Sequence, residues 1–201
     1  MPRTLPPKAT DLQTFNSNGF PFKVTYGNLI ESAKAGEFDL IAHGCNCHCV
    51  MGAGIAKVIR DTWPEAYKAD LATKKGDRSK MGSYSSAIVG PLTIANLYTQ
   101  FDYTRTKVDL DYDALRECLR KLKQDFSGKR IGLPLIGAGL ASGNWNYIKE
   151  IIGETLAGED VTVVILKDTV APADDTPETG GGEEVAQRRD SATSRPPKHV
   201  G

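Results

Sequence analysis

The segment from residue 43 to residue 49 reads His-Gly-Cys-Asn-Cys-His-Cys and concentrates reactive side chains. Histidine exchanges protons near neutral pH, and thiolates are nucleophiles and zinc ligands. In structural zinc sites two or more residues stand between paired ligands, whereas a single residue stands between successive cysteines here. Neighbouring side chains of such a segment point apart and could hardly bind one ion. The spacing therefore favours thiols that line a ligand loop, and it leaves acid–base chemistry at His43 open. It predicts neither a metal site nor a cofactor. A hydrogen-bonded histidine at a strand end is the alternative for His43.

A glycine loop follows this segment. An apolar run, Phe38 to Ala42, has the length of a buried strand, and a helical pattern of apolar residues begins at Ile55. Between them stands Gly52-Ala53-Gly54. A strand, a glycine loop and a helix start aim backbone N–H groups at an anion, and glycine lets the backbone approach a phosphate closely. This order predicts an anion site, although a glycine pair that only makes a turn is an alternative.

A second glycine loop repeats the design. The strand predicted at 131–136 leads to Gly137-Ala138-Gly139, and a helix follows that is led by Asn144. Ligands of open α/β sheets bind beyond the carboxyl ends of the strands, where both loops would lie. The two loops together predict a site that closes over one diphosphate.

Composition limits the remaining possibilities. A chain of 201 residues with 40% hydrophobic content suits one domain with a sizeable core. The net charge of zero gives no reason to expect nucleic acid or an anionic membrane as partner. The sequence contains neither a signal-like apolar segment near its start nor an apolar run of membrane-spanning length. Three cysteines crowded into residues 45–49 do not resemble a disulfide framework, so we expect a reducing, cytoplasmic location.

Hydrophobic periodicity and turn residues predict the elements that must hold these loops. We expect a flexible arm over 1–21, a domain over 22–167 and, because residues 168–201 are poor in apolar side chains, a disordered tail. Tyr98, Trp145 and Cys118 are expected to pack in the core, and 74–80 to form a charged surface loop. The predicted strands are 22–26, 38–43, 84–89, 93–101, 131–136 and 161–166, and the predicted helices are 29–35, 55–63, 65–75, 112–126 and 145–156.

Four blocks of the sequence resemble the macrodomain family: Tyr26-Gly-Asn-Leu29, the segment from His43 through Ala56, Asn96-Leu-Tyr-Thr-Gln100, and Pro134 to Leu140. They are most similar to the branch that holds ADP-ribose 1''-phosphate phosphatases and related phage-encoded proteins. The resemblance covers about residues 22 to 167. It implies a three-layer α/β/α fold around a central mixed sheet, with ADP-ribose lying across the strand ends.

The resemblance also implies roles for individual residues. Asn28 would lie beside the adenine, where most macrodomains have Asp, and a neutral carbonyl acceptor there predicts weaker adenine binding. Asn46 would reach the distal ribose, and the two glycine loops would hold the diphosphate from both sides. The implied ligand-binding residues are Gly27, Asn28, Leu29, Asn46, Met51, Gly52, Ala53, Gly54, Ile55, Ala56, Ile136, Gly137, Ala138, Gly139 and Leu140.

Three functions compete at such a site. The first is hydrolysis of ADP-ribose 1''-phosphate, for which the resemblance implies His43 and, where related enzymes use an Asp, Asn144. The second is a non-catalytic reader or sequestering protein for ADP-ribose or a cyclic signalling relative. The third is removal of ADP-ribose from modified macromolecules, which is disfavoured because Gln100 and Ala141 replace the Lys nucleophile and the Asp of the similar glycohydrolases. The expected partners are ADP-ribose or its 1''-phosphate and, for the third function, ADP-ribosylated macromolecules.

Overall fold

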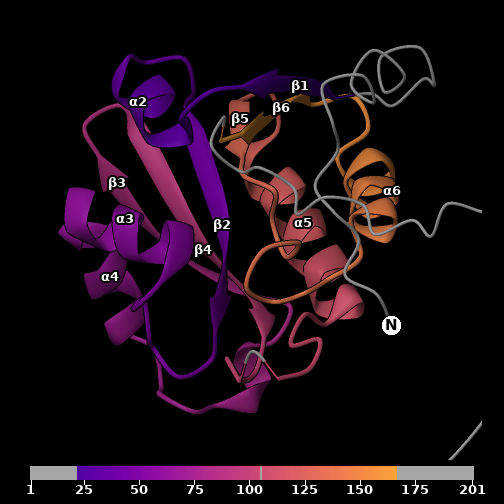
Figure 1. Ribbon diagram of the computed structural model, residues 1–201. Helices are drawn as coiled ribbons and strands as arrows, with labels where there is room; N and C mark the ends of the chain where they lie inside the picture. Colours follow the sequence, from indigo (N-terminus) through magenta and orange to yellow (C-terminus); the bar gives the residue numbers. More distant parts are fainter. Residues whose placement is uncertain (1–21, 105, 167–201) are drawn as a thin grey trace, which may run out of the picture.

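The computed structural model describes residues 22–104 and 106–166, so the predicted arm (1–21) and tail (168–201) lie outside the described residues. Six strands and five α-helices make up this part of the chain (Figure 1). The strands are β1 (Lys23–Tyr26), β2 (Leu40–Asn46), β3 (Tyr84–Val89), β4 (Leu92–Gln100), β5 (Arg130–Leu133) and β6 (Asp160–Ile165). The helices are α2 (Leu29–Lys34), α3 (Gly54–Thr62), α4 (Pro64–Leu71), α5 (Tyr112–Phe126) and α6 (Trp145–Thr155), and η1 (Arg78–Lys80) is a short 3-10 turn.

The strands form one mixed sheet in the order β1-β6-β5-β2-β4-β3. The neighbours pair in parallel, except that β3 runs antiparallel to β4. The short turn at Gly90 and Pro91 explains the exception, because a tight turn can join only antiparallel strands. The carboxyl ends of the five parallel strands therefore meet at one edge of the sheet, where the glycine loops begin.

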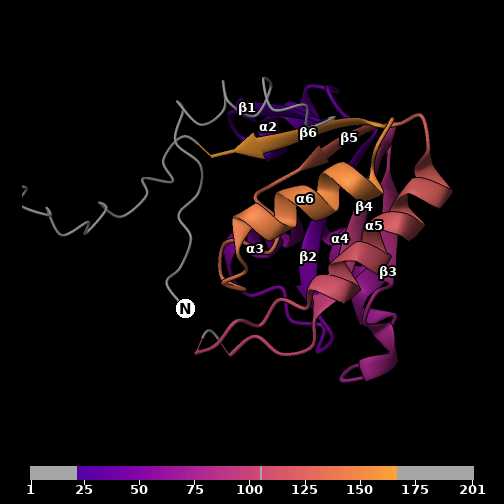
Figure 2. The same ribbon diagram turned by 90° about the vertical axis from the view of Figure 1, so that its right-hand side faces the viewer.

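Helices cover both faces of the sheet. One hydrophobic cluster joins the sheet to α5 and α6, and a second joins it to α2, α3 and α4. Adjacent β2 residues divide between them: Leu40 and Ala42 belong to the first cluster and Ile41 to the second, as expected from the alternation of a strand. Figure 2, which looks from the side of α5 and α6, shows these two helices in front of the sheet. The predicted three-layer α/β/α fold with a mixed sheet is confirmed.

Two strand boundaries differ from the prediction at the places that matter for the site. β2 continues to Asn46 instead of ending at His43, because His43 to Cys45 pair with consecutive residues of β4. Residues 44–46, which were expected to follow the strand as a loop, therefore belong to β2. β5 ends at Leu133 instead of residue 136, because Pro134 has no N–H to continue the ladder.

The elements outside the site mostly follow the sequence pattern. α4 ends at Leu71, earlier than predicted. Tyr98, Trp145 and Cys118 are buried as expected, whereas Lys80, which was expected in a surface loop, is also buried. Among residues 22–104 and 106–166, none of the helices has the length and apolar character that a bilayer span requires.

Candidate functional site

The two glycine loops lie against each other at the carboxyl edge of the sheet. β2 and β5 are adjacent and parallel, with Leu40 paired to Ile131. A Cβ atom at Gly54 would lie 3.2 Å from Leu140 Cδ1, so the first loop touches the second. Gly54 also has a φ of +56°, a conformation that side chains other than glycine rarely adopt. The structure thus brings together the two segments that the sequence predicted to share one ligand.

The first loop leads into a helix start that has no cap. Ala53 occupies the N-cap position of α3, offers no capping side chain, and no acidic residue stands in the first turn. The Lys57 N–H donates to Ala53 O at 3.2 Å, which begins the helical bonding. The N–H groups of Gly54, Ile55 and Ala56 precede that bond and have no acceptor within the helix. They form a positively polarised end that suits an anion.

The second loop is closed by its own hydrogen bonds. Ala138 N–H donates to Leu135 O at 3.2 Å, and Gly143 N–H donates to Gly137 O at 2.8 Å. Gly143 packs so closely that a Cβ there would lie 2.3 Å from Leu110 Cδ2. Gly139 and Leu140, at the exposed tip, lie toward the first loop and solvent.

Asn144 caps α6 at the end of this loop. Its Oδ1 accepts from Asn146 N–H at 2.9 Å, and its backbone N–H donates to the Tyr112 hydroxyl at 2.7 Å. The side-chain oxygen is therefore held by the helix. This position explains Asn144 as a structural residue and gives no support to the catalytic role that the sequence suggested for it.

His43 lies inside the protein. Its side chain has no exposed area, and Nε2 lies 2.8 Å from Asn96 Oδ1. Asn96 in turn donates to Ala66 O of α4 at 2.8 Å. Burial lowers the pKa of His43 from 6.5 to about 4, so the ring is neutral at pH 7. The geometry fits the alternative interpretation, a hydrogen-bonded strand histidine, and gives His43 no path to a substrate.

At the position that the resemblance assigns to the adenine, Asn28 is exposed but its carbonyl is engaged. Oδ1 accepts from Ile30 N–H at 2.9 Å and from Glu31 N–H at 3.4 Å, and so caps α2. The outward group is the Nδ2 amide, which only donates. The carbonyl on which the expected contact with a base depends is therefore shared with the cap of α2, and that contact stays a prediction.

Other predicted site residues offer only their backbone. The side chains of Leu29, Met51 and Ile136 are buried in the two hydrophobic clusters. Asn46 is also buried, and it holds its own loop: Nδ2 donates to Val50 O at 2.8 Å, and Oδ1 accepts from His48 N–H at 2.9 Å. Gly27, Gly52 and Ala56 leave their backbones at least partly accessible.

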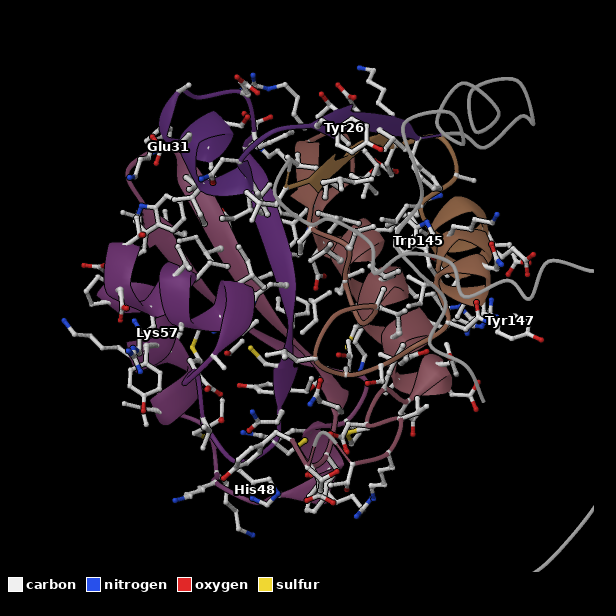
Figure 3. The ribbon with its side chains drawn as sticks, viewed as in Figure 1. Tyr26, Glu31, His48, Lys57, Trp145 and Tyr147 are labelled. Atoms are coloured by element: carbon white, nitrogen blue, oxygen red, sulfur yellow. The ribbon has the colours of Figure 1, made fainter. Side chains whose placement is uncertain are left out.

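Sequence reasoning missed a second histidine at this edge. His48 is partly exposed, and its Nε2 lies 3.1 Å from Asp102 Oδ1. Its ring centre lies 4.8 Å from that of Phe101 in an edge-on contact. Figure 3 shows His48 at the end of the molecule where β2 ends. The sequence assigns His48 no role once its spacing argues against zinc, since nothing in the chain pattern pairs it with Asp102.

A cavity of about 450 Å³ lies beside this pair and contains none of the predicted site residues. It opens between the end of β4 and the start of α5, a region that the sequence identified only as a loop. Its lining carries both charges, with more carboxylates than cations. The lining residues are Arg78, Met81, Phe101, Asp102, Lys107, Val108, Asp109, Leu110, Asp111, Tyr112 and Asp113.

The cysteines of the 45–49 segment point in different directions. Cys45 Sγ lies 3.7 Å from His43 Nδ1, whereas Cys49 Sγ donates to Asp70 O at 3.3 Å. Within residues 22–104 and 106–166, no three His, Cys, Asp or Glu side chains come together as metal ligands.

Comparison with known proteins identifies a relative from a phage. No protein-family model matches the chain. The chain is 36% identical over 133 residues to an uncharacterized 17.5 kDa protein from the tk–vs intergenic region of Enterobacteria phage T4, which corresponds to 62% of this chain and 84% of that protein.

Solved structures identify the fold. The macrodomain of Thermus aquaticus DarG superposes with a TM-score of 0.57 at 24% identity, over 73% of this chain and 97% of that one. Thermosipho africanus DarTG, solved in complex with ADP-ribose, superposes with a TM-score of 0.56 at 14% identity, over 71% of this chain and 41% of the longer protein. At these identities the likeness shows the fold alone, and that fold is the macrodomain fold.

Proposed function

Because the chain belongs to the same family as the 17.5 kDa protein of phage T4 and has the macrodomain fold, we propose that it binds ADP-ribose or ADP-ribose 1''-phosphate between its two glycine loops. The observation that carries this proposal is the uncapped start of α3. Its three N–H donors lie where the first loop meets Leu140, and no side chain of the first turn neutralises them. A diphosphate supplies the acceptors that they lack.

The binding energy in this proposal comes from the backbone. Each hydrogen bond to a charged group contributes about 1.5–3 kcal/mol, so the donors at Gly54, Ile55 and Ala56 would hold the diphosphate without a lysine or arginine. Leu140, against Gly54, would cover the diphosphate from the second loop. The structure of Thermosipho africanus DarTG, to which this fold is similar, was solved in complex with ADP-ribose, and this supports ADP-ribose as the ligand here.

Binding without turnover is the function that the geometry supports best. Neither His43 nor Asn144 presents a free reactive group to the cleft, for the reasons of burial and capping given above. Removal of ADP-ribose from macromolecules has no support in the side chains either. Gln100 is an amide that donates to Asp102 O at 2.7 Å, and Ala141 has no functional group.

Phosphate hydrolysis is a second candidate because of the His48–Asp102 pair. A carboxylate that holds one ring nitrogen leaves the other free to exchange a proton with water, the arrangement common to many hydrolases. The pair lies beyond the ends of β2 and β4, on the side where the distal ribose would extend from the diphosphate. In this proposal His48, not His43, would activate the water.

Calorimetry on the full-length protein tests the binding proposal. We expect one molecule of ADP-ribose to bind per chain, and AMP, which lacks the diphosphate, to bind at least about tenfold more weakly because it leaves charge-assisted hydrogen bonds unmade. Absence of heat with both ADP-ribose and its 1''-phosphate would contradict the proposal. Equal affinity for AMP would contradict the role of the loops.

An assay of released phosphate from ADP-ribose 1''-phosphate separates the two candidates. Binding without release supports the reader or sequestering function. Release that is lost in His48→Gln but kept in His43→Gln supports hydrolysis through His48. The reverse pattern would restore His43 as the catalytic histidine.

A further inference from the structure

A buried cluster under α4 is not used by the proposed function. Lys80 Nζ donates to Thr73 Oγ1 at 2.7 Å and to Cys49 Sγ at 3.4 Å. It also lies 3.9 Å from Asp70 Oδ1 and 4.3 Å from the centre of the Tyr98 ring. The side chains of Lys80 and Asp70 are only 8% and 1% exposed. A lysine amine and a cysteine thiol are thus held together away from bulk water.

The backbone at Cys49 adds to this arrangement. Its φ is +55°, which is rare outside glycine and costs about 1–2 kcal/mol. Contacts to Asp70 O at 3.3 Å and to the Thr73 hydroxyl at 3.6 Å hold the thiol in place. These contacts therefore hold Sγ beside Nζ although the backbone conformation at Cys49 is unfavourable.

We propose that Cys49 and Lys80 are a site of oxidative modification, at which hydrogen peroxide produces a sulfenamide cross-link between Sγ and Nζ. Cysteine thiols oxidise to sulfenic acids, and a sulfenic acid condenses with a nearby nitrogen nucleophile. The proposal does not depend on the ligand of the glycine loops. It rests on the contact of Sγ with Nζ and on the hydrogen bonds that hold both atoms in place.

The reaction balances with one molecule of peroxide. The thiol and H₂O₂ give a sulfenic acid and water, so that sulfur is oxidised by two electrons and peroxide is reduced. The neutral Lys80 amine then attacks Sγ, an S–N bond forms, the S–O bond breaks, and hydroxide leaves as water with a proton from the nitrogen. The extra proton of the ammonium ion goes to the Asp70 carboxylate, whose Oδ1 lies 3.9 Å from Nζ.

The other thiols differ from Cys49 in their surroundings. Cys45 Sγ lies 3.7 Å from His43 Nδ1, and Cys118 Sγ donates to Ser83 O at 3.2 Å. Cys49 differs because its thiol accepts a hydrogen bond from a lysine, Lys80. The cross-link would join the loop between β2 and α3 to η1.

Mass spectrometry of the full-length protein after mild peroxide treatment tests the proposal. We expect the intact mass to fall by about 2 Da and digestion to yield one linked pair of peptides, with residues 49 and 80 joined. A thiol reductant should restore the original mass. A Cys47→Ser variant should form the same link.

Lys80→Arg is the matched control, since it keeps a cation beside Asp70 but replaces the nucleophilic amine. In this variant we expect a gain of about 16 Da at Cys49 instead of a link. If Lys80→Arg does not fold, the presence or absence of the linked peptides in the peroxide-treated original protein tests the proposal. A disulfide between Cys49 and another cysteine, a simple gain of oxygen at Cys49 without a link, or no change at all would overturn the proposal.

Discussion

The two glycine loops share one sequence design but differ in how their helices begin. α6 starts with Asn144, whose side chain satisfies its first turn, and α2 and α5 are capped in the same way by Asn28 and Asp111. α3 starts with Ala53 and has no such cap. Leaving a helix uncapped costs about 0.5–2 kcal/mol. α4 also lacks a side-chain cap, but Pro64 in its first turn has no N–H to satisfy, whereas α3 begins with three N–H groups that a ligand could use. The comparison supports our proposal that the α3 loop binds the ligand and that the α6 loop supports it.

Ala53→Asp would convert the first loop into a copy of the second. The new carboxylate would cap α3 and occupy the donors that we assign to the diphosphate, besides repelling it. We expect the free energy of unfolding to rise by about 1 kcal/mol, while ADP-ribose affinity falls at least about 100-fold, because two or more charge-assisted hydrogen bonds are lost. Urea unfolding and calorimetry measure the two effects. Gains in both stability and affinity would show that the α3 start does not contact the ligand.

Acid should reveal a second difference, between the strands that lead into the loops. β2 carries His43, whose folded pKa of about 4 lies below its ordinary 6.5, whereas β5 carries no histidine. The unfolded chain therefore binds a proton that the folded chain does not, so stability is complete above pH 6.5 and declines as the pH falls toward 4. The loss amounts to about 3 kcal/mol over that range. Urea unfolding at pH 7 and pH 5 checks it, and His43→Gln should flatten this dependence. An unchanged slope in the variant would mean that His43 is protonated in the folded state.

Alanine substitutions at two glycines compare the loops directly. Gly54→Ala should lower the free energy of unfolding by about 1–2 kcal/mol, because it forces a side chain into a positive φ and against Leu140. Gly139→Ala, the matched change in the second loop, meets no atom within 4 Å and should be neutral or stabilising by up to about 1 kcal/mol. Thermal or urea unfolding of both variants measures the difference. Equal changes in the free energy of unfolding of the two variants would mean that the two loops do not differ in backbone strain.

Most of the fold followed from the sequence because local chemistry decides it. Periodicity predicted α5 over 112–126, and the turn residues Gly90 and Pro91 predicted the β3–β4 hairpin, both as observed. The errors arose where pairing between distant segments overrides local preference. β2 extends to Asn46 because its last residues pair with β4, and no pattern within residues 43–46 predicts this pairing.

The site was predictable in its backbone and not in its side chains. The glycine spacing identified both loops, and the structure places them in contact. The burial of His43 under α4, the pairing of His48 with Asp102, and the burial of Lys80 each depend on a partner at least seven residues away. The residue type alone gives the possible chemistry of a side chain, whereas the tertiary partner decides whether that chemistry can be used.

Asn144→Ala tests whether the second loop is only a support. Removing the α6 cap should reduce the free energy of unfolding by about 1 kcal/mol and change ADP-ribose affinity less than about twofold, because the side chain faces its own helix. Asn144→Asp keeps the cap and serves as the control, with stability close to that of the original protein. A large loss of affinity in Asn144→Ala at unchanged stability would give Asn144 a direct role in the site.

The smallest effect is expected at the base end, where Asn28 caps α2 and turns its Nδ2 outward. The exocyclic amine of adenine is a donor, so it finds no acceptor on this side chain. Asn28→Asp keeps one oxygen on the helix and presents the second to the base, and it also places a charge at the N-terminus of α2, which favours the helix. We expect a few-fold rise in affinity for ADP-ribose and none for an analogue whose base carries a carbonyl in place of the amine, since that group cannot donate. Calorimetry with the two compounds separates a gain at the base from a general stabilisation of α2, and an equal gain for both would place the base away from Asn28.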